Sequence, residues 1–143
     1  MQNSNKTIIT IEATIKAPIT KIWDFWITPE HIIQWNTASP DWHTPKAIQD
    51  FKVGGSFSFR MEAKDGSFGF DFNGKYDVIE PHHAIAYTME DNRKVTTQFI
   101  HQENSIHIIQ SFEAETENTI ELQKSGWQSI LDNFKKYAEN TAN

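Results

Sequence analysis

The chain has 143 residues and no cysteine, which fits one compact domain over residues 1–143 and excludes disulfides, thiolate nucleophiles and Cys-ligated zinc. Its net charge of −6 at pH 7 argues against nucleic acid or an anionic membrane surface as a partner, because both require clustered Lys and Arg. The 13% aromatic content predicts an interior built from large rings, and such interiors are either solid or hollow.

The N-terminal residues predict one strand. No basic patch followed by a long apolar run is present, so we expect neither a signal peptide nor membrane insertion, and we expect a cytoplasmic protein. From Thr7 to Ile15 apolar and polar residues alternate, which is typical of a strand with one buried face. The apolar face holds Ile9, Ile11, Ala13 and Ile15.

Two short helices are predicted next. Pro18 suits a first helical turn, and four apolar residues then recur at helical spacing, namely Ile19, Ile22, Trp23 and Trp26. Thr28 is expected to cap a second helix that begins with Pro29. Residues 37–52 contain two prolines and little periodicity, so we predict a loop there, with a short edge strand near Ala47 to Phe51.

An antiparallel meander is predicted from Ser56 to about Ala114, because alternation persists between regularly spaced turn signals. A two-residue turn at Asp65-Gly66 sets apolar residues opposite one another throughout, pairing Ala63 with Phe68, Met61 with Phe70, Phe59 with Phe72 and Phe57 with Gly74. A turn at Asn73-Gly74 would instead set Phe72 opposite Lys75 and Phe70 opposite Asp77, so apolar residues would no longer face one another. We therefore predict a bend at Gly74 inside a long strand, covered by the Phe57 ring.

The later hairpins predict a polar row on the inner face of the sheet. A three-residue loop at Asp91 to Arg93 pairs Tyr87 with Thr97, and a two-residue turn at Glu103-Asn104 pairs Thr97 with Gln110. These three side chains would then lie side by side among apolar residues. Buried polar groups need hydrogen-bond partners, and a ligand, an ordered water or the three side chains themselves can supply them.

The last segment, from Glu117 to about Glu139, predicts a long helix. Asn118 and Glu121 resemble a capping box, and the apolar stripe consists of Trp127, Ile130, Leu131 and Phe134. The predicted fold class is therefore α+β, with a curved antiparallel sheet, two short helices after the first strand and a long C-terminal helix packed across the sheet. A fatty-acid-binding-type barrel is the second choice, because it lacks the long C-terminal helix.

A curved sheet and a straight helix diverge away from their line of closest approach, which leaves room for a hydrophobic cavity. Because the helix face above the stripe carries Gly126, Gln123 and Ser125 near its middle, we expect part of that space to be unfilled. The alternative is a dry core of interdigitated rings. For a cavity we predict Trp42 and His43 at the mouth and, as ligand-binding residues, Phe57, Phe59, Met61, Phe70, Phe72, Tyr76, Tyr87, Thr97, Gln110, Gln123, Trp127 and Leu131.

Four stretches resemble one family over about residues 6–140, namely "APITKIWDFWITPEHIIQW", "FKVGGSFSFRMEAKDGS", the Y-x-x-I-E-P of Tyr76 to Pro81, and "GWQSILDNFKKYAE". They are similar to the START-like (SRPBCC, birch-pollen-allergen-like) superfamily and, within it, to the homologues of the activator of heat-shock protein 90 ATPase. The resemblance implies a helix-grip fold that encloses a cavity for lipids, hormones, polyketides or other small apolar molecules. It supplies no invariant catalytic residues. The founding activator has an additional N-terminal chaperone-binding domain, for which this chain has no room, so a chaperone contact is doubtful.

No catalytic site, metal site or cofactor is predicted. The six histidines show neither an HExxH motif nor another spacing that zinc requires. Asp41 and His43 flank Trp42 and could form an acid/base pair at the pocket mouth. However, no nucleophile or oxyanion donor is evident, so the favoured interpretation is that Trp42 plugs the cavity end and His43 caps a backbone group.

The function predicted from the sequence is binding of a small, mainly apolar molecule. The protein would act as an intracellular carrier or sensor, and a stress-related role is one possibility. The ligand would stack on Phe59, Phe72 and Trp127 and form hydrogen bonds with the predicted polar row. One alternative is an enzyme of the cyclase, dehydratase or hydrolase type, with Asp41, His43 or Tyr87 transferring protons; it rests on fold analogy alone. Another is an interaction module that binds a chaperone or forms a homodimer through the outer face of the sheet.

Overall fold

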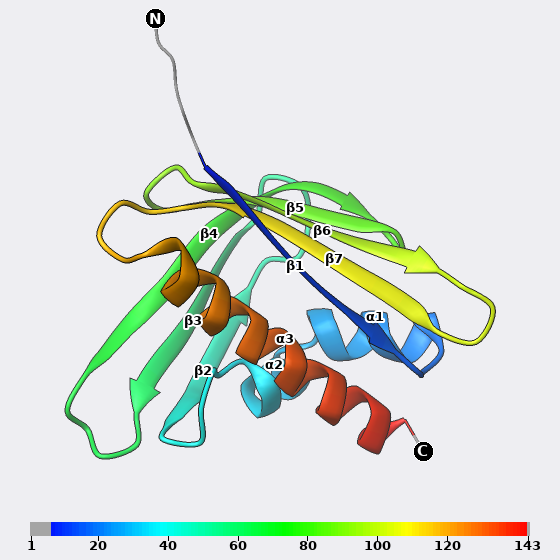
Figure 1. The fold of residues 1–143 in the computed structure, drawn as a ribbon, viewed down its shortest axis with the longest axis horizontal. Coiled ribbons are helices and arrows are strands. Elements are labelled where there is room, and N and C mark those ends of the chain that lie inside the picture. The colour runs from blue at the N-terminus through cyan, green and yellow to red at the C-terminus, as the bar shows by residue number, and fades with distance from the viewer. Residues whose placement is uncertain (1–6, 143) are drawn as a thin grey trace, which may run out of the picture.

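The computed structural model describes residues 7–142. The seven described strands form one antiparallel sheet in the order β1-β7-β6-β5-β4-β3-β2, and Figure 1 shows it curling around the C-terminal helix. The predicted α+β helix-grip architecture is confirmed. Its elements are β1 (Ile8–Ile15), α1 (Ile19–Ile27), α2 (Pro29–Trp35), β2 (Trp42–Gln49), β3 (Ser56–Ala63), β4 (Gly69–Glu80), β5 (Ala84–Met89), β6 (Lys94–His101), β7 (Ile106–Glu113) and α3 (Ile120–Thr141).

The core lies where α3 meets β1 and the two short helices. Leu131, Phe134 and Ala138 of α3 are buried there together with Ile11 and Ile15 of β1. The Phe134 ring packs edge-on against two indoles, with centroid distances of 4.8 Å to both Trp26 and Trp35. The helix is therefore anchored to one half of the sheet and to α1 and α2, which close one end of the fold (Figure 1).

The short turn between α1 and α2 differs in detail from the prediction. Thr28 occupies the N-cap position of α2, as expected, but its hydroxyl donates to Asp24 Oδ1 at 2.8 Å instead of accepting from a backbone N–H. The same residue also ends α1, where its N–H donates to the Asp24 carbonyl at 3.0 Å. Thr28 thus ends α1 and begins α2, and its side chain forms its hydrogen bond with α1. Pro18 is the N-cap of α1 rather than a residue of its first turn.

The prediction of a loop before Ala47 is wrong, because β2 already begins at Trp42. The register with β3 shifts between His43 and Lys46, and this bulge contains Pro45. A proline lacks the N–H that a central strand needs, but it is tolerated at a bulge of an edge strand. Since β2 is an edge of the sheet, the proline interrupts the alternation without ending the strand.

The predicted β3–β4 hairpin is confirmed. Phe57 lies opposite Gly74, Phe59 opposite Phe72, and Met61 opposite Phe70. A Cβ atom on Gly74 would lie 2.4 Å from Cζ and 2.6 Å from Cε2 of Phe57, so the ring sits directly on the glycine. This contact supports the bend of β4 at the place where the cavity begins.

Replacing Gly74 by Ala should destabilise the protein by about 1–3 kcal/mol, the usual range for an overpacked core position. The added methyl group meets the Phe57 ring and also the Thr88 carbonyl oxygen at 3.0 Å. Urea unfolding measures the loss. In a Phe57→Leu background the same change should be less destabilising, because the shorter side chain leaves room above the glycine. Equal losses in both backgrounds would contradict the contact.

The predicted register between β5 and β6 is wrong, because Tyr87 lies opposite Val95 and Ile85 lies opposite Thr97. The hairpin loop begins at Glu90 instead of Asp91, with the Met89 N–H donating to the Arg93 carbonyl at 2.8 Å. Its third residue, Asn92, has a φ of 73°. Three-residue hairpin loops place a left-handed residue at that position, and Asn adopts this conformation more readily than Arg. The predicted register of β6 with β7 is confirmed, including Thr97 opposite Gln110.

Candidate ligand-binding cavity

A cavity of about 940 Å³ lies between α3 and the inner face of the sheet. It forms because α3 packs against β1 and the short helices, while β3 and β4 curve away from it. The volume falls in the range of about 300–1,000 Å³ that is typical of small-molecule sites. The interior is therefore hollow rather than completely filled by its own rings.

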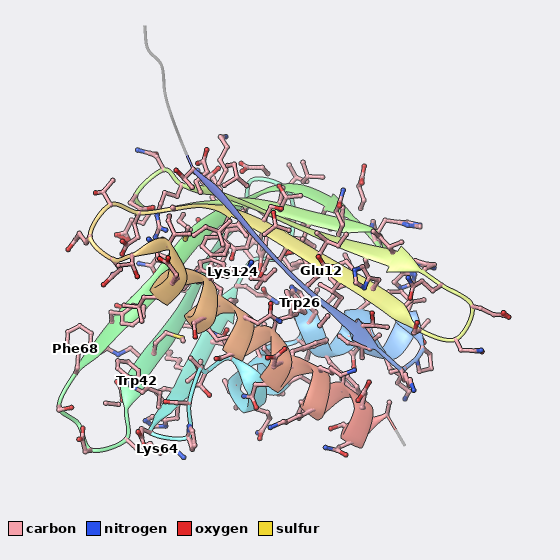
Figure 2. The ribbon with its side chains drawn as sticks, viewed as in Figure 1. Glu12, Trp26, Trp42, Lys64, Phe68 and Lys124 are labelled. Carbon is pink, nitrogen blue, oxygen red and sulfur yellow. The ribbon has the colours of Figure 1, made fainter. Side chains whose placement is uncertain are left out.

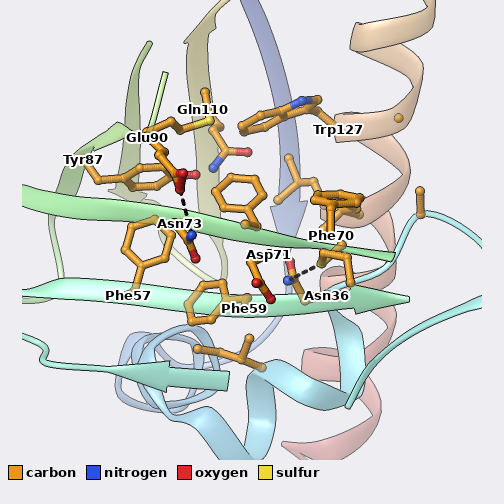
Figure 3. Close-up of a pocket in the computed structure, with 18 of the residues that line it drawn as sticks. Asn36, Phe57, Phe59, Phe70, Asp71, Asn73, Tyr87, Glu90, Gln110 and Trp127 are labelled. Carbon is orange, nitrogen blue, oxygen red and sulfur yellow. Dashed lines mark hydrogen bonds between the residues drawn. The ribbon is translucent and has the colours of Figure 1, made fainter. Parts of the chain in front are cut away.

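Two walls of aromatic side chains face each other across the cavity (Figure 3). On the sheet side, the Phe57 and Phe59 rings stack with their centroids 4.9 Å apart. On the helix side, Phe112 of β7 stacks on Trp127 with a centroid distance of 4.0 Å and an interplanar angle of 13°. This stacking supports one face of the indole and fixes its orientation at the cavity wall. Phe72 lies edge-on to the same indole at 6.1 Å.

Helix α3 leaves open space at one point of the wall. Gly126 lines the cavity, and a Cβ atom built on it would meet nothing within 4 Å. The adjacent Trp127, Ile130 and Leu131 complete the helix side. At the far end, Trp26, Ile32 and Trp35 of the short helices close the cavity.

The structure brings all predicted ligand-binding residues to this cavity except two. Thr97 is 1% exposed, and its hydroxyl oxygen accepts a hydrogen bond from Gln110 Nε2 at 2.9 Å. Gln123 serves the start of α3: its side-chain oxygen accepts from the Glu115 N–H at 2.9 Å, and its amide group donates to the Asn118 carbonyl at 2.9 Å. Thr97 therefore orients a lining residue, whereas Gln123 orders a loop.

The two residues predicted at the pocket mouth point in different directions. Trp42 lines the cavity and contacts Phe68 and Phe70 at ring distances of 6.0 and 6.1 Å, and Figure 2 shows Trp42 and Phe68 near the tip of the β3–β4 hairpin. His43 follows on the opposite face of β2, where its Nε2 lies 3.7 Å from Glu62 Oε1. Among residues 7–142 no contact joins the side chains of Asp41 and His43, so an acid/base pair is not assembled.

Sequence reasoning missed the polar mouth. β5 ends at Met89 opposite Gly74, so the first part of β4 has no neighbour on that side, and the cavity opens there. Asn73 and Glu90 stand at this opening, where the Glu90 N–H donates to the Asn73 carbonyl at 3.1 Å. Asn73 has outward parity in β4, so the alternation of the strand gives no signal for it. Apart from Tyr76, Tyr87 and Gln110, the other polar lining residues are Asn36, Ser39, Asp71, Asp91, Arg93 and Glu115.

Three polar side chains lie deeper in the cavity. The Tyr76 hydroxyl donates to Gln49 Oε1 at 2.5 Å and is thereby satisfied. The Tyr87 hydroxyl forms no hydrogen bond with another residue in the described part of the chain, and burial raises the pKa of this phenol, so it stays neutral. Gln110 is 7% exposed, and only its nitrogen is engaged, by Thr97, among the described residues. Tyr87 and Gln110 therefore have hydrogen-bonding capacity left for a bound molecule.

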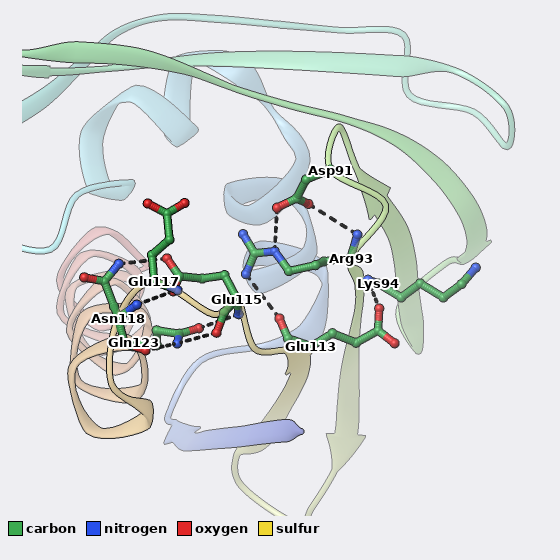
Figure 4. A network of polar contacts seen from close by, with 8 residues as sticks. All are labelled: Asp91, Arg93, Lys94, Glu113, Glu115, Glu117, Asn118 and Gln123. Carbon is green, nitrogen blue, oxygen red and sulfur yellow. Dashed lines mark hydrogen bonds and ion pairs between the residues drawn. The ribbon is translucent and has the colours of Figure 1, made fainter. Parts of the chain in front are cut away.

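A network of polar contacts fixes the two loops at the mouth (Figure 4). Arg93 donates from Nε to Asp91 Oδ2 at 2.7 Å and from Nη1 to the Glu113 carbonyl at 3.1 Å. Glu115 accepts from the Asn118 N–H at 2.6 Å. Its hydrogen bonds with the backbone and side chain of Asn118 lower the pKa of its carboxyl group. The β5–β6 loop is thus tied to the end of β7, and the loop that enters α3 is ordered.

The described residues contain no group of three or more His, Asp and Glu side chains placed to hold a metal ion. Within the same residues, no helix combines the length and apolar character needed to cross a membrane.

Comparisons with known proteins agree with this architecture. Residues 16–139 match the family described as Activator of Hsp90 ATPase homolog 1-like protein. The solution structure of an AHSA1-like protein from Aeromonas hydrophila is 43% identical, with a TM-score of 0.89 and 94% of each chain covered. A protein from Cytophaga hutchinsonii is 48% identical, with a TM-score of 0.81 over 96% of this chain and 94% of that chain. One from Nitrosomonas europaea shares the fold at 13% identity, with a TM-score of 0.80 over 94% of this chain and 95% of the other. No curated protein matches the sequence.

Proposed function

This chain belongs to the family of Activator of Hsp90 ATPase homolog 1-like proteins, and for this member we propose that it binds a small, mainly apolar molecule between α3 and the sheet, as a carrier or sensor. The observation that carries the proposal is the cavity of about 940 Å³ with its two aromatic walls. A core selected for stability alone would fill such a space, because interiors are close-packed and voids destabilise them.

Apolar contact supplies most of the binding energy in this proposal. A ligand that buries about 300 Å² of apolar surface gains about 7.5 kcal/mol at about 25 cal/mol per Å², and part of this gain is offset by the loss of translational and rotational freedom. The flat faces of Phe59, Phe72 and Trp127 favour a ring system as the ligand's body. The protein would therefore hold its ligand with moderate affinity and release it again.

Tyr87 and Gln110 give the ligand its orientation. Both lie on the otherwise apolar inner wall, and both retain unused hydrogen-bonding capacity within the described residues. A polar group of the ligand that replaces the water at these side chains adds about 1 kcal/mol per hydrogen bond. Loss of one such bond should therefore weaken binding about fivefold.

Two matched probes test this proposal, namely 2-naphthaleneethanol and 2-ethylnaphthalene, which lacks the hydroxyl group. Both should quench tryptophan fluorescence and shift the NMR signals of Gly126 and Trp127. Tyr87→Phe and Gln110→Leu should each weaken binding of the alcohol about fivefold and leave the hydrocarbon unaffected. If neither probe shifts the signals of these cavity residues, the binding function is wrong. If the variants weaken both probes equally, the polar anchor is wrong.

A further inference from the structure

The aromatic wall on the sheet side continues beyond the cavity. Phe70 lines the cavity and is nevertheless 42% exposed, whereas Phe68, two residues earlier, lies outside the lining and is 62% exposed. Their ring centroids are 6.2 Å apart, and Trp42 of β2 contacts both rings. These three residues form one aromatic cluster near the end of the β3–β4 hairpin, where Figure 2 labels Trp42 and Phe68. We call them the tip cluster.

The tip cluster lies on the same face of the sheet as the cavity wall. Phe68, Phe70 and Phe72 stand at alternate positions of the chain, so their side chains point to one side. Phe70 lies opposite Met61, and the row ends where the Ala63 N–H donates to the Phe68 carbonyl at 2.9 Å. The wall therefore passes from the enclosed cavity to a part of the sheet that is open to solvent, without a change of face.

The hairpin turn is closed without these rings. The Gly66 N–H donates to the Ala63 carbonyl at 3.0 Å, and the Ser67 N–H donates to Asp65 Oδ1 at 2.8 Å. A ring that is 62% exposed, as that of Phe68 is, contributes little burial to the folded protein. Contiguous exposed apolar side chains mark binding surfaces. The tip cluster therefore has the character of a surface that becomes covered on binding.

Continuity with the cavity identifies what covers the tip cluster. Trp42 and Phe70 belong to both surfaces, because each lines the cavity and each contacts Phe68 outside it. A molecule that fills the cavity and extends past Phe70 meets Phe68 next on the same face. The occupant that fits this arrangement is the outer end of the cavity's own ligand.

The spacing of these groups sets the length of such a ligand. The Tyr87 ring, the proposed polar anchor, lies edge-on to Phe72 with the ring centroids 6.3 Å apart. Phe68 lies four residues before Phe72, which corresponds to about 13 Å of strand at about 3.3 Å per residue. A molecule that forms a hydrogen bond with Tyr87 and also covers Phe68 is therefore about 20 Å long.

We propose, resting on the binding function above, that the tip cluster is an outer subsite for an elongated ligand. The polar end of the ligand lies at Tyr87 and Gln110 inside the cavity, and its apolar tail leaves the cavity over Phe70 and covers Phe68. Removing the exposed rings from water strengthens binding only of ligands that reach them. The protein thereby selects long molecules with one polar end over compact ring systems.

Two probes test the outer subsite by fluorescence titration: 2-naphthaleneethanol, which is too short to reach the tip cluster, and 6-octyl-2-naphthaleneethanol, which is long enough. The octyl probe should bind at least about tenfold tighter, and it alone should shift the NMR signal of the Ala63 methyl group. Phe68→Ser should weaken binding of the octyl probe about fivefold, the effect of losing about 40 Å² of apolar contact, and leave 2-naphthaleneethanol unchanged. Val53→Ser is the matched control, because Val53 is also 62% exposed and lies outside the cavity lining; it should change neither affinity.

The outcomes separate the outer subsite from the function on which it rests. If Phe68→Ser leaves binding of the octyl probe unchanged, or weakens both probes equally, the outer subsite is wrong and the cavity remains a binding site. If neither probe binds to the parent chain, the binding function itself is wrong. If sedimentation shows a ligand-free dimer that Phe68→Ser abolishes, a second copy covers the tip cluster and the assignment to a ligand is wrong. A loss limited to the octyl probe supports both proposals.

Discussion

Gly126→Phe should strongly weaken binding of apolar probes while the protein stays folded. Gly126 lies on α3 at the cavity wall, and a Cβ atom at this position meets nothing within 4 Å. A phenyl ring there extends into the empty space between the helix and β4. Glycine in the interior of a helix is unfavourable by about 1 kcal/mol relative to Ala, so the substitution also removes a local penalty. The ring occupies the part of the cavity beside Trp127, on which a ligand is expected to stack.

Gly126→Ala is the matched control. It removes the same glycine but adds one methyl group, so it should stabilise the protein by about 0.5–1 kcal/mol, which corresponds to a rise in Tm of about 2–4 °C. Its affinity for 2-naphthaleneethanol should stay within about twofold of the parent chain. The affinity of Gly126→Phe should fall at least about tenfold, because the added ring lies next to Trp127, on which the probe is expected to stack. If Gly126→Phe folds and binds the probe with normal affinity, the probe must bind outside this cavity.

The β3–β4 hairpin could be predicted to the residue because its pattern admits one register. Every apolar pair from Phe57 opposite Gly74 to Met61 opposite Phe70 depends on the turn at Asp65-Gly66. Slipping a strand by one residue reverses its faces. Placing the turn at Asp65-Gly66 therefore predicted which residues of β4 face inward, and with them most of the sheet wall of the cavity.

The register of β5 with β6 could not be predicted in the same way. A slip by two residues leaves every side chain on the same face, so the apolar pattern is satisfied by Tyr87 opposite Thr97 and equally by Tyr87 opposite Val95. The register is decided by the backbone of the loop, where Asn92 adopts a positive φ. The predicted polar row is therefore reduced to the pair formed by Thr97 and Gln110, with Tyr87 displaced along β5.

Helix α3 illustrates how close competing caps can be. Asn118 was the predicted cap, but Thr119 caps the helix and accepts from the Leu122 N–H at 3.0 Å. Asn118 donates instead to both carboxylate oxygens of Glu115. Both side chains are good N-caps, and the choice between them depends on a contact with the preceding loop that the helix sequence does not contain.

The mouth of the cavity depends on where strands end, not on their pattern. Asn73 faces outward by parity, and Glu90 is a loop residue; they reach the cavity because β5 stops short of the start of β4. Strand lengths follow from tertiary packing, which is the part of a fold that local sequence describes least well. The apolar walls were therefore predictable, whereas the polar residues at the mouth were not.

Gly55→Ala is expected to have the largest effect on stability. A Cβ atom on Gly55 would lie 1.9 Å from the carbonyl oxygen of Asp50 and 3.1 Å from that of Lys52. Both atoms belong to the backbone of the same tight turn, in which the Gly55 N–H donates to the Lys52 carbonyl at 2.8 Å. No side-chain rotation can relieve the overlap, so the turn itself must open.

Opening this turn affects the sheet and the cavity together. The Gly54 N–H donates to the Tyr76 carbonyl at 2.8 Å, and the Tyr76 N–H donates to the Gly55 carbonyl at 2.9 Å. The turn is thereby hydrogen-bonded to β4 beside its bulge, and Tyr76 and Phe51 both line the cavity. We expect Gly55→Ala to destabilise the protein by about 4 kcal/mol or more, with a fall in Tm of more than about 8 °C.

A substitution at the neighbouring Gly54 distinguishes the effect of steric overlap on stability from the effect of backbone conformation. Gly54 has a φ of 85°, but a Cβ atom on it meets nothing within 4 Å. Gly54→Ala should therefore destabilise the protein only by the penalty of a left-handed residue, about 1–2 kcal/mol. Urea unfolding of both variants measures the difference. Similar losses for Gly54→Ala and Gly55→Ala would show that conformation, and not the contact with Asp50, makes the double glycine necessary.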